Sequence, residues 1–291
     1  MSDVSDGTLV LVGHGSRAGE ANREFLAFAE KLRQATGLAV EPGFVELAEP
    51  TLAEALDRAA RLSAEVAVVP FILFAAGHVK LDLPLEIEAA RRRHPGMRFA
   101  QAAPLGLHPR LLEIAGERLD AALDKLGETG AAERAVLLVG RGSSDPDANS
   151  EVAKLARLLS EGRGCMLVEA AYCGVTRPSV PEGLERIARL GARGVVVLPH
   201  LIFAGVLEAR LRDNIAAFRR AFPGIEAVLA DTLGGDPRLI EVVLERRGEA
   251  LDGVVRMSCD LCKYKVRLPG FADERGGEKA LLHAAHHTAS K

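Results

Sequence analysis

The sequence lacks a long hydrophobic run, an excess of basic residues and a signal-like amino terminus. The longest apolar run, Val66–Ala76, is much shorter than the roughly 20 residues that cross a bilayer, which argues against a membrane protein. There are 37 Lys and Arg against 40 Asp and Glu, so the net charge of −3 makes nucleic acid a poor partner. The polar, acidic segment Met1–Gly7 is unlike a secretory signal peptide.

Cysteine is also scarce. Four cysteines in 291 residues do not indicate a disulfide scaffold, and they favour a reduced, cytoplasmic setting. What the chain does have is apolar side chains. Hydrophobic residues make up 48% of the sequence, enough to bury a large core and too many for a disordered protein. The length is sufficient for two ordinary domains.

Strand-like and helix-like segments alternate through the first half. Thr51 and Glu54 have the spacing of a capping box, and Pro84 and Pro109 suit the first turn of a helix. Such alternation is typical of a parallel sheet with helices on both faces. The predicted strands are Leu9–Val12, Leu38–Val45, Val66–Phe74 and Arg98–Ala102, and the predicted helices are Glu20–Gln34, Thr51–Leu62, Pro84–Arg93 and Pro109–Lys125.

The second half of the chain repeats the first. Val12–Ser16 reads Val-Gly-His-Gly-Ser, and Val139–Ser143 reads Val-Gly-Arg-Gly-Ser. The offset is nearly constant, since 142 − 15 = 127 at the glycines and 237 − 109 = 128 at the prolines. A repeat of this length indicates a duplicated α/β domain with about four parallel strands in each copy. The predicted parts are an active N-terminal domain at 1–128, a C-terminal domain at 129–250 and a tail at 251–291.

Three polar residues follow successive predicted strands of the first half. His14 follows the first strand, Glu46 the second and His78 the third. Because parallel strands all point their carboxyl ends the same way, these side chains are expected at one edge of the sheet. Two imidazoles and a carboxylate can hold a divalent transition metal, and they can accept protons near neutral pH.

The second half lacks this set. Arg141 stands in place of His14, Gly174 in place of Glu46 and Val206 in place of His78. Residues needed only for the fold would be expected in both copies. The difference therefore favours a catalytic role for the first copy alone.

The tail contains a different pattern. Cys259 and Cys262 form a Cys-x-x-Cys pair, which is a metal or redox signature outside a packed domain. Two thiolates do not complete a tetrahedral site, so a cluster would need other ligands or a second subunit. His283, His286 and His287 near the end suit loose metal binding.

Taken together, these motifs resemble the class II tetrapyrrole chelatases. The resemblance rests on Val12–Arg17, on Phe44–Glu46 with the Pro-Thr pair after it, and on Pro70–His78. The repeat and the tail segment Met257–Cys262 are similar to the long form of the sirohydrochlorin cobaltochelatases. The resemblance covers nearly the whole chain.

This family resemblance implies two flavodoxin-like lobes with the tetrapyrrole between them. It implies a metal chelatase of the lyase class, which inserts Co²⁺ into sirohydrochlorin on the anaerobic route to cobalamin. His14 and His78 would be the catalytic, metal-binding pair with Glu46 beside them. Cys259 and Cys262 would hold an iron–sulfur cluster, and a homodimer could form through these tail cysteines.

The macrocycle has many carboxylates, which cationic and hydroxyl side chains could orient through charged hydrogen bonds. Candidates lie beside the two histidines and at the matching loop of the second copy. The predicted substrate-binding residues are Ser16, Arg17, Lys80, Arg141 and Ser143.

Three alternatives remain open from the sequence. The same reaction could use iron or nickel, since the affinities of any such site follow the Irving–Williams order. A histidine phosphatase also has His-Gly after a first strand, but it would want arginine where Gly13 stands. A non-catalytic carrier of metal or tetrapyrrole would suit the histidine-rich tail.

Overall fold

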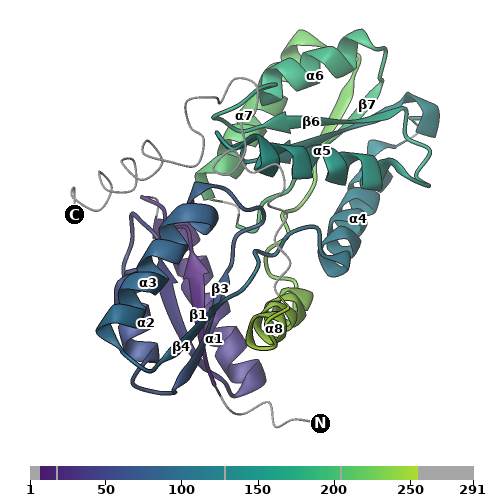
Figure 1. Ribbon diagram of the computed structural model, residues 1–291. Coiled ribbons are helices and arrows are strands. Elements are labelled where there is room, and N and C mark those ends of the chain that lie inside the picture. Colours follow the sequence, from purple (N-terminus) through teal and green to yellow (C-terminus); the bar gives the residue numbers. More distant parts are fainter. Residues whose placement is uncertain (1–6, 18, 128, 204, 255–291) are drawn as a thin grey trace. The chain divides into compact units, whose positions relative to one another are not determined.

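The computed structural model describes residues 7–17, 19–127, 129–203 and 205–254, which form two parallel sheets of four strands each (Figure 1). The strand orders are β2-β1-β3-β4 and β6-β5-β7-β8, and every strand pair is parallel. The predicted fold class is confirmed. The strands are β1 Thr8–Gly13, β2 Ala39–Phe44, β3 Glu65–Pro70, β4 Arg98–Gln101, β5 Arg134–Gly140, β6 Leu167–Tyr172, β7 Gly194–Pro199 and β8 Glu226–Leu229.

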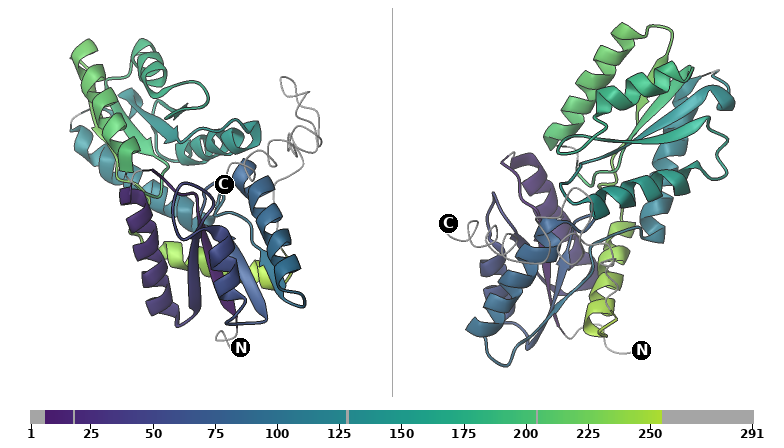
Figure 2. Two further views of the ribbon diagram at one scale, coloured as in Figure 1. Left: turned by 90° about the vertical axis from the view of Figure 1, so that its left-hand side faces the viewer. Right: turned by 45° about the horizontal axis from the view of Figure 1, so that its top comes forward.

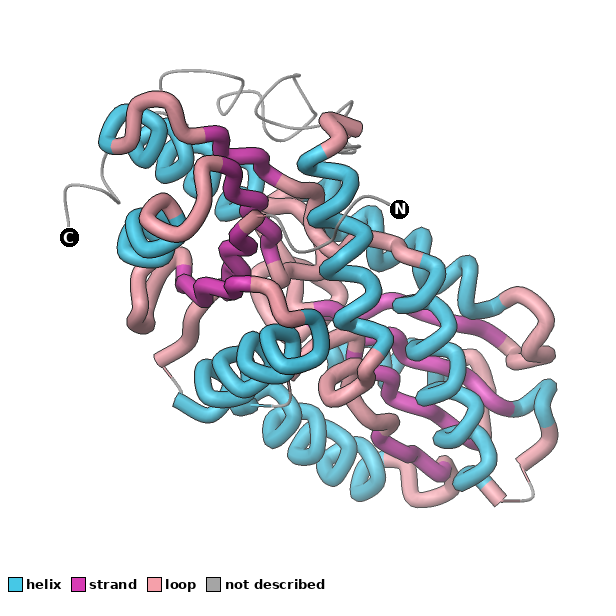
Figure 3. The backbone as a smooth tube through the Cα atoms, turned by 90° about the horizontal axis from the view of Figure 1, so that it is seen from below, coloured by secondary structure: helices cyan, strands magenta, loops and turns pink. Residues whose placement is uncertain are grey.

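Helices lie on both faces of each sheet, as Figure 3 shows with helices in cyan and strands in magenta. No helix in the part of the chain that the structure describes is long and apolar enough to cross a bilayer. The helices are α1 Gly19–Thr36, α2 Leu52–Ala59, α3 Leu83–Arg93, α4 Pro109–Leu123, α5 Pro146–Ser160, α6 Val180–Arg189, α7 Gly205–Ala221 and α8 Arg238–Leu251, with a π-helical turn at His78–Asp82 and 3₁₀ turns at Asp124–Leu126 and Ala131–Glu133.

The described chain divides into two compact units. Unit 1 comprises residues up to Gly106, the short segment Asp145–Asp147 and residues from Ile240 onward. Unit 2 comprises Leu107–Ser144 and Ala148–Leu239. The central strands β1 and β5 read as unbroken apolar runs because each is covered on both faces.

One face of each sheet is covered by a matching pair of helices. In unit 1, α2 and α3 pack their apolar sides on β1 and β3, with Leu56 and Ile87 buried against Val10 and Val68. In unit 2, α6 and α7 do the same on β5 and β7. Equivalent capping boxes start α2 at Thr51 and α6 at Ser179, and the first of these confirms the sequence prediction.

The compact units and the sequence repeats differ in the last helix of each repeat. The last helix of the first repeat, α4, groups with unit 2, and α8 groups with unit 1 from Ile240 onward (Figure 1, Figure 2). Arg246 of α8 donates hydrogen bonds to the carbonyls of Pro104 and Leu105, at 3.0 and 2.9 Å. The predicted boundaries at 128 and 250 follow the repeat, whereas the compact units exchange the final helix of each half.

Candidate metal centre

His14 lies in the loop that leaves β1, and a glycine holds this loop against the loop after β2. Gly15 has φ +91°, and a Cβ added there would lie 1.7 Å from the carbonyl oxygen of Glu46. Only glycine permits that approach. The amide of Glu46 donates to the carbonyl of His14 at 3.1 Å, which fixes the two residues side by side. The Gly-His-Gly motif therefore places the imidazole next to the carboxylate.

His78 begins the π-helical turn His78–Asp82, which runs directly into α3. Three residue steps separate Phe74 from Gly77, but only two separate Phe203 from Gly205 in the second repeat, where an α-helix follows. The first repeat thus has one extra residue just before the turn. π-Turns are rare and frequently lie at functional sites.

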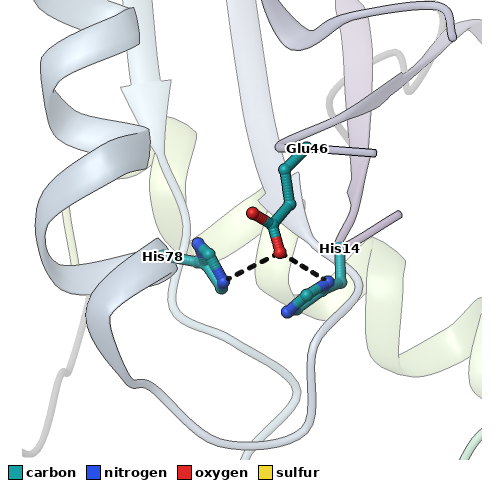
Figure 4. Close-up of side chains that lie close together, drawn as sticks. All are labelled: His14, Glu46 and His78. Atoms are coloured by element: carbon teal, nitrogen blue, oxygen red, sulfur yellow. Dashed lines mark ion pairs between the residues drawn. The ribbon is translucent and has the colours of Figure 1, made fainter. Parts of the chain in front are cut away.

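The three predicted side chains meet at the carboxyl edge of the first sheet (Figure 4). Glu46 Oε1 lies 3.7 Å from His14 Nδ1 and 3.7 Å from His78 Nε2. The imidazole rings are 4.4 Å apart and nearly perpendicular. One ligand atom from each residue lies within 4.8 Å of the others, and all three side chains are partly exposed, at 21, 27 and 31%. A small cation can reach this group from solvent.

Asp82 is a fourth member of the site that the sequence reasoning missed. Its Oδ2 lies 2.7 Å from His78 Nδ1. A proton on Nδ1, donated to this carboxylate, leaves the Nε2 lone pair directed to the Glu46 side. The signal that could have found it is the spacing of four residues from His78, which brings two side chains together if the segment before the predicted helix Pro84–Arg93 is itself helical. The corresponding residue of the second repeat is Arg210, since 82 + 128 = 210.

The donor set consists of two imidazole nitrogens and one carboxylate oxygen, which suits divalent Co, Ni, Fe or Zn. On His14, Nδ1 also lies 2.9 Å from the carbonyl oxygen of Gly15. If Nδ1 carries the proton and donates it there, Nε2 becomes the accepting nitrogen. Neutral imidazoles of this kind can bind a cation or take up a proton.

Lys80 lies in a different environment from the one predicted. Its Nζ donates to Asp145 Oδ2 at 2.8 Å and to Asp147 Oδ2 at 2.7 Å. The side chains are nearly buried, with exposed fractions of 3% for Lys80, 1% for Asp145 and 10% for Asp147. Burial alone would lower the pKa of Lys80, but these two hydrogen bonds outweigh it, so the pKa is raised. The ammonium group is therefore held within unit 1 by two carboxylates.

The other predicted substrate-binding residues lie on the loops after β1 and β5. Arg17 and Arg141 are exposed, and Ser16 and Ser143 are partly exposed. The carbonyls of both serines accept hydrogen bonds from equivalent asparagines one turn into the next helix. These residues remain predictions as substrate contacts.

The remaining histidines and cysteines have other settings. His108 caps α4 by accepting from the amide of Arg110, and His94 lies 2.8 Å from Asp57. His200 is buried, and burial lowers its pKa to about 4, so its imidazole is neutral. Cys259 and Cys262, like the three tail histidines, lie outside the described residues.

The fold and the cluster together define a class: a duplicated parallel α/β protein with a group of nitrogen and oxygen donors that could hold a metal ion at one sheet edge. The CbiX family model matches residues 8–122 and 135–250, which are the two repeats. The chain belongs to the CbiX family. The resemblance to tetrapyrrole chelatases that the motifs predicted is thereby confirmed at the level of the family.

Curated relatives include chelatases for two metals. The chain is 40% identical to the sirohydrochlorin cobaltochelatase of Priestia megaterium, over 89% of this chain and 85% of that protein. It is 33% identical to a sirohydrochlorin ferrochelatase of the same organism, over 73% of this chain and 79% of that protein. A solved relative is the sirohydrochlorin chelatase SirB of Bacillus subtilis subspecies spizizenii in complex with cobalt. It has a TM-score of 0.70 and 26% identity, and the match covers 85% of this chain and 96% of that one.

Proposed function

We propose that this protein inserts Co²⁺ into sirohydrochlorin, with unit 1 as the active unit. The observation that supports this proposal best is the convergence of His14, Glu46 and His78 in unit 1, the one such group among the residues that the structure describes. At the equivalent positions the second repeat has Arg141, Gly174 and Val206.

The chemistry requires a metal ion to be handed over and two pyrrole protons to be removed. Both metal and tetrapyrrole are substrates, and each inserted Co²⁺ replaces two protons, which leaves charge balanced. The Nε2 lone pairs of neutral His14 and His78 bind the cation first and, as it passes to the macrocycle, each becomes free to accept one of the two pyrrole protons. Glu46, between them, offsets the charge of the partly desolvated cation. Asp82 keeps the Nε2 of His78 available by holding its Nδ1 proton.

Cobalt is the metal that the relatives favour. The cobaltochelatase relative shares 40% of aligned residues with this chain, against 33% and 29% for two ferrochelatase relatives. Imidazole and carboxylate donors bind cobalt, iron and nickel, and the donor types alone do not select cobalt, so this choice depends on the relatives. Insertion of iron or nickel and binding without turnover are the competing functions.

The macrocycle's carboxylates are assigned to cationic and hydroxyl side chains of the two equivalent loops. Arg17 and Arg141 are the exposed cations there, and Ser16 and Ser143 stand beside them. Charge-assisted hydrogen bonds from these groups would orient the substrate. Lys80 is left out of this assignment, because its ammonium group already donates to Asp145 and Asp147.

The tail predictions concern residues outside the described part of the chain. We propose an iron–sulfur cluster at Cys259 and Cys262, shared in a homodimer, and a cytoplasmic location. Iron and acid-labile sulfide in anaerobically purified protein, with C259S and C262S as comparisons, would test the cluster. Equal iron content in all three proteins would exclude it. No step of metal insertion depends on this cluster.

The central experiment is anaerobic insertion of Co²⁺, Fe²⁺ and Ni²⁺ into sirohydrochlorin, followed by absorbance. Cobalt insertion should be the fastest of the three and should collapse in H14A and H78A. Faster iron or nickel insertion would keep the mechanism and change the metal. If no metal is inserted but the tetrapyrrole binds tightly, the protein is a carrier and the enzymatic proposal fails.

A further inference from the structure

The π-helical turn at the metal centre has partly exposed ends and a buried middle. His78 and Asp82, at its two ends, are partly exposed and lie 2.7 Å apart at Nδ1 and Oδ2. Val79 is 1% exposed, and its carbonyl accepts a hydrogen bond from the side-chain amide of Gln101 at 3.1 Å. The side chain of Lys80 is 3% exposed. The ends of the turn therefore reach solvent, and its middle is fastened to the protein.

The partners of Lys80 come from the second repeat. Asp145 and Asp147 lie at the start of α5, and they group with unit 1 although the residues on either side of them group with unit 2. Each accepts a hydrogen bond from Lys80 Nζ, at 2.8 and 2.7 Å. Asp145 Oδ1 also accepts from the amide of Asp147 at 3.1 Å, which keeps the two carboxylates together. One lysine thus joins the metal-binding turn to a segment 65 positions further along the chain.

The matching position of the second repeat has a different residue and a different contact. Glu208 stands there, since 80 + 128 = 208. It pairs with Arg212 of the same helix, α7, and a pair within one helix does not fasten that helix to another segment. The counterpart of His78 is Val206. The buried cation and the metal-binding histidine are therefore both specific to the turn of the first repeat.

A metal centre needs such an anchor because its donors tolerate little movement. Ligand distances in metal sites are defined to within about 0.2 Å, and the side chains around the donors must themselves be fixed. His78 Nε2 faces Glu46 Oε1 across 3.7 Å (Figure 4). The turn that contains His78 is five residues long, so a shift at Lys80 also shifts this nitrogen. Buried ion pairs are often no more stabilising than apolar side chains of similar volume, so stability alone does not account for a lysine here.

We propose that Lys80 is a positioning residue of the metal centre: its ion pair with Asp145 and Asp147 fixes the turn so that His78 Nε2 meets the cation. This proposal rests on the proposed function, which assigns His78 to the metal. Lys80 itself touches neither the metal nor the tetrapyrrole in this role. The second repeat then takes part in the metal centre through two carboxylates that hold Lys80 in place of a metal ion.

The first test measures Co²⁺ affinity in the absence of tetrapyrrole, by competition with a chromophoric chelator. K80M should bind Co²⁺ about 10–100-fold more weakly than wild type, the loss typical of removing a group that orients a metal ligand. D147N removes one of the two anionic acceptors and should cost about three- to tenfold. Because D147N retains the Asp145 contact, it keeps the proposal testable if K80M is too unstable to assay.

The control separates positioning from support of the fold. Leu32 lies on α1 in unit 1 and is 0% exposed, so L32A leaves a cavity and lowers stability without touching the turn. Urea unfolding would establish that L32A and K80M are destabilised to a similar extent and are folded under the assay conditions. L32A should then keep the Co²⁺ affinity of wild type, and H78A, which removes a ligand, should lose it.

Insertion kinetics give a second readout. In K80M the KM for Co²⁺ should rise about tenfold while the KM for sirohydrochlorin stays within about twofold, because the change acts on a metal ligand. Unchanged Co²⁺ affinity in K80M and D147N, with weaker binding in H78A, would overturn this proposal alone. So would a loss of affinity in L32A as large as that in K80M. Co²⁺ affinity that H78A leaves unchanged would instead overturn the proposed function.

Discussion

The two units place different side chains on closely similar loops. Both repeats place a Gly-x-Gly loop after their first strand and press it against the loop after their second. In unit 1 the residues exposed there are histidine and carboxylate, and in unit 2 they are arginine and valine. The fold therefore decides where a side chain stands, and the residue type decides what it binds. Only the first copy has the residues that the proposed function assigns to the metal.

The largest difference between the units should be catalytic. H14A or H78A should lower cobalt insertion by about 10²–10⁴-fold, because each removes a metal ligand and proton acceptor. Initial rates measured by absorbance would show it. H94A, which removes a histidine paired with Asp57 away from the cluster, is the control and should keep wild-type rates. Full activity in H78A would refute the assignment of the centre.

Lys80 and the residue at the matching position of unit 2, Glu208, should contribute differently to the free energy of unfolding. Lys80 is nearly buried between two carboxylates, whereas its counterpart Glu208 pairs with the exposed Arg212. K80M should lower the free energy of unfolding by about 3–5 kcal/mol, because it leaves two carboxylates without their cation. E208Q should lower it by less than about 1 kcal/mol. Urea unfolding of both variants makes the comparison, and equal effects would contradict it.

The next prediction concerns Asp82, whose proposed role is to hold the Nδ1 proton of His78. D82N should weaken Co²⁺ binding or insertion by about 10–100-fold, because the amide no longer favours the Nδ1 proton that directs Nε2 of His78. Metal affinity by competition with a chelator and the pH profile of insertion are the readouts. E88Q on the neighbouring helix α3 keeps the fold and the cluster, so it serves as the control. An unchanged pH profile and affinity in D82N would reduce Asp82 to a structural role.

The smallest expected effect is a loss of stability on removing a helix cap, and it should be the same in both units. Thr51 and Ser179 head equivalent capping boxes, on α2 and α6. T51A and S179A should each lower the free energy of unfolding by about 1 kcal/mol, and neither should alter insertion. Thermal unfolding measures both. A loss several times larger in one unit would show that the boxes are not equivalent.

Local patterns were sufficient to predict the strands and helices of the first half and the meeting of His14, Glu46 and His78, although the third strand, predicted to run to Phe74, ends at Pro70. Apolar runs mark the strands, glycine ends the first strand of each half at Gly13 and Gly140, and parallel strands bring their carboxyl ends together. Asp82 was missed although its spacing from His78 is local. The π-helical turn was also missed, and its signal was the one-residue surplus before Gly77.

Contacts between distant segments could not be predicted in the same way. Lys80 meets carboxylates 65 and 67 positions away, and a single sequence gives no indication of such pairs. The sequence pattern also could not predict which compact unit α4 and α8 would join. Either helix has an apolar side that either sheet could cover, so periodicity alone assigns each to its own repeat.

Because α4 and α8 are exchanged, each half of the sequence contains a helix that belongs to the other compact unit, so neither half contains a complete unit. The chain passes from one compact unit to the other at Gly106, Ser144, Asp147 and Leu239. A cut in the linker near 127–133 would therefore strip each sheet of a helix that the other fragment contains. Neither fragment is then expected to fold alone, and the two should fold together when mixed, by fragment complementation.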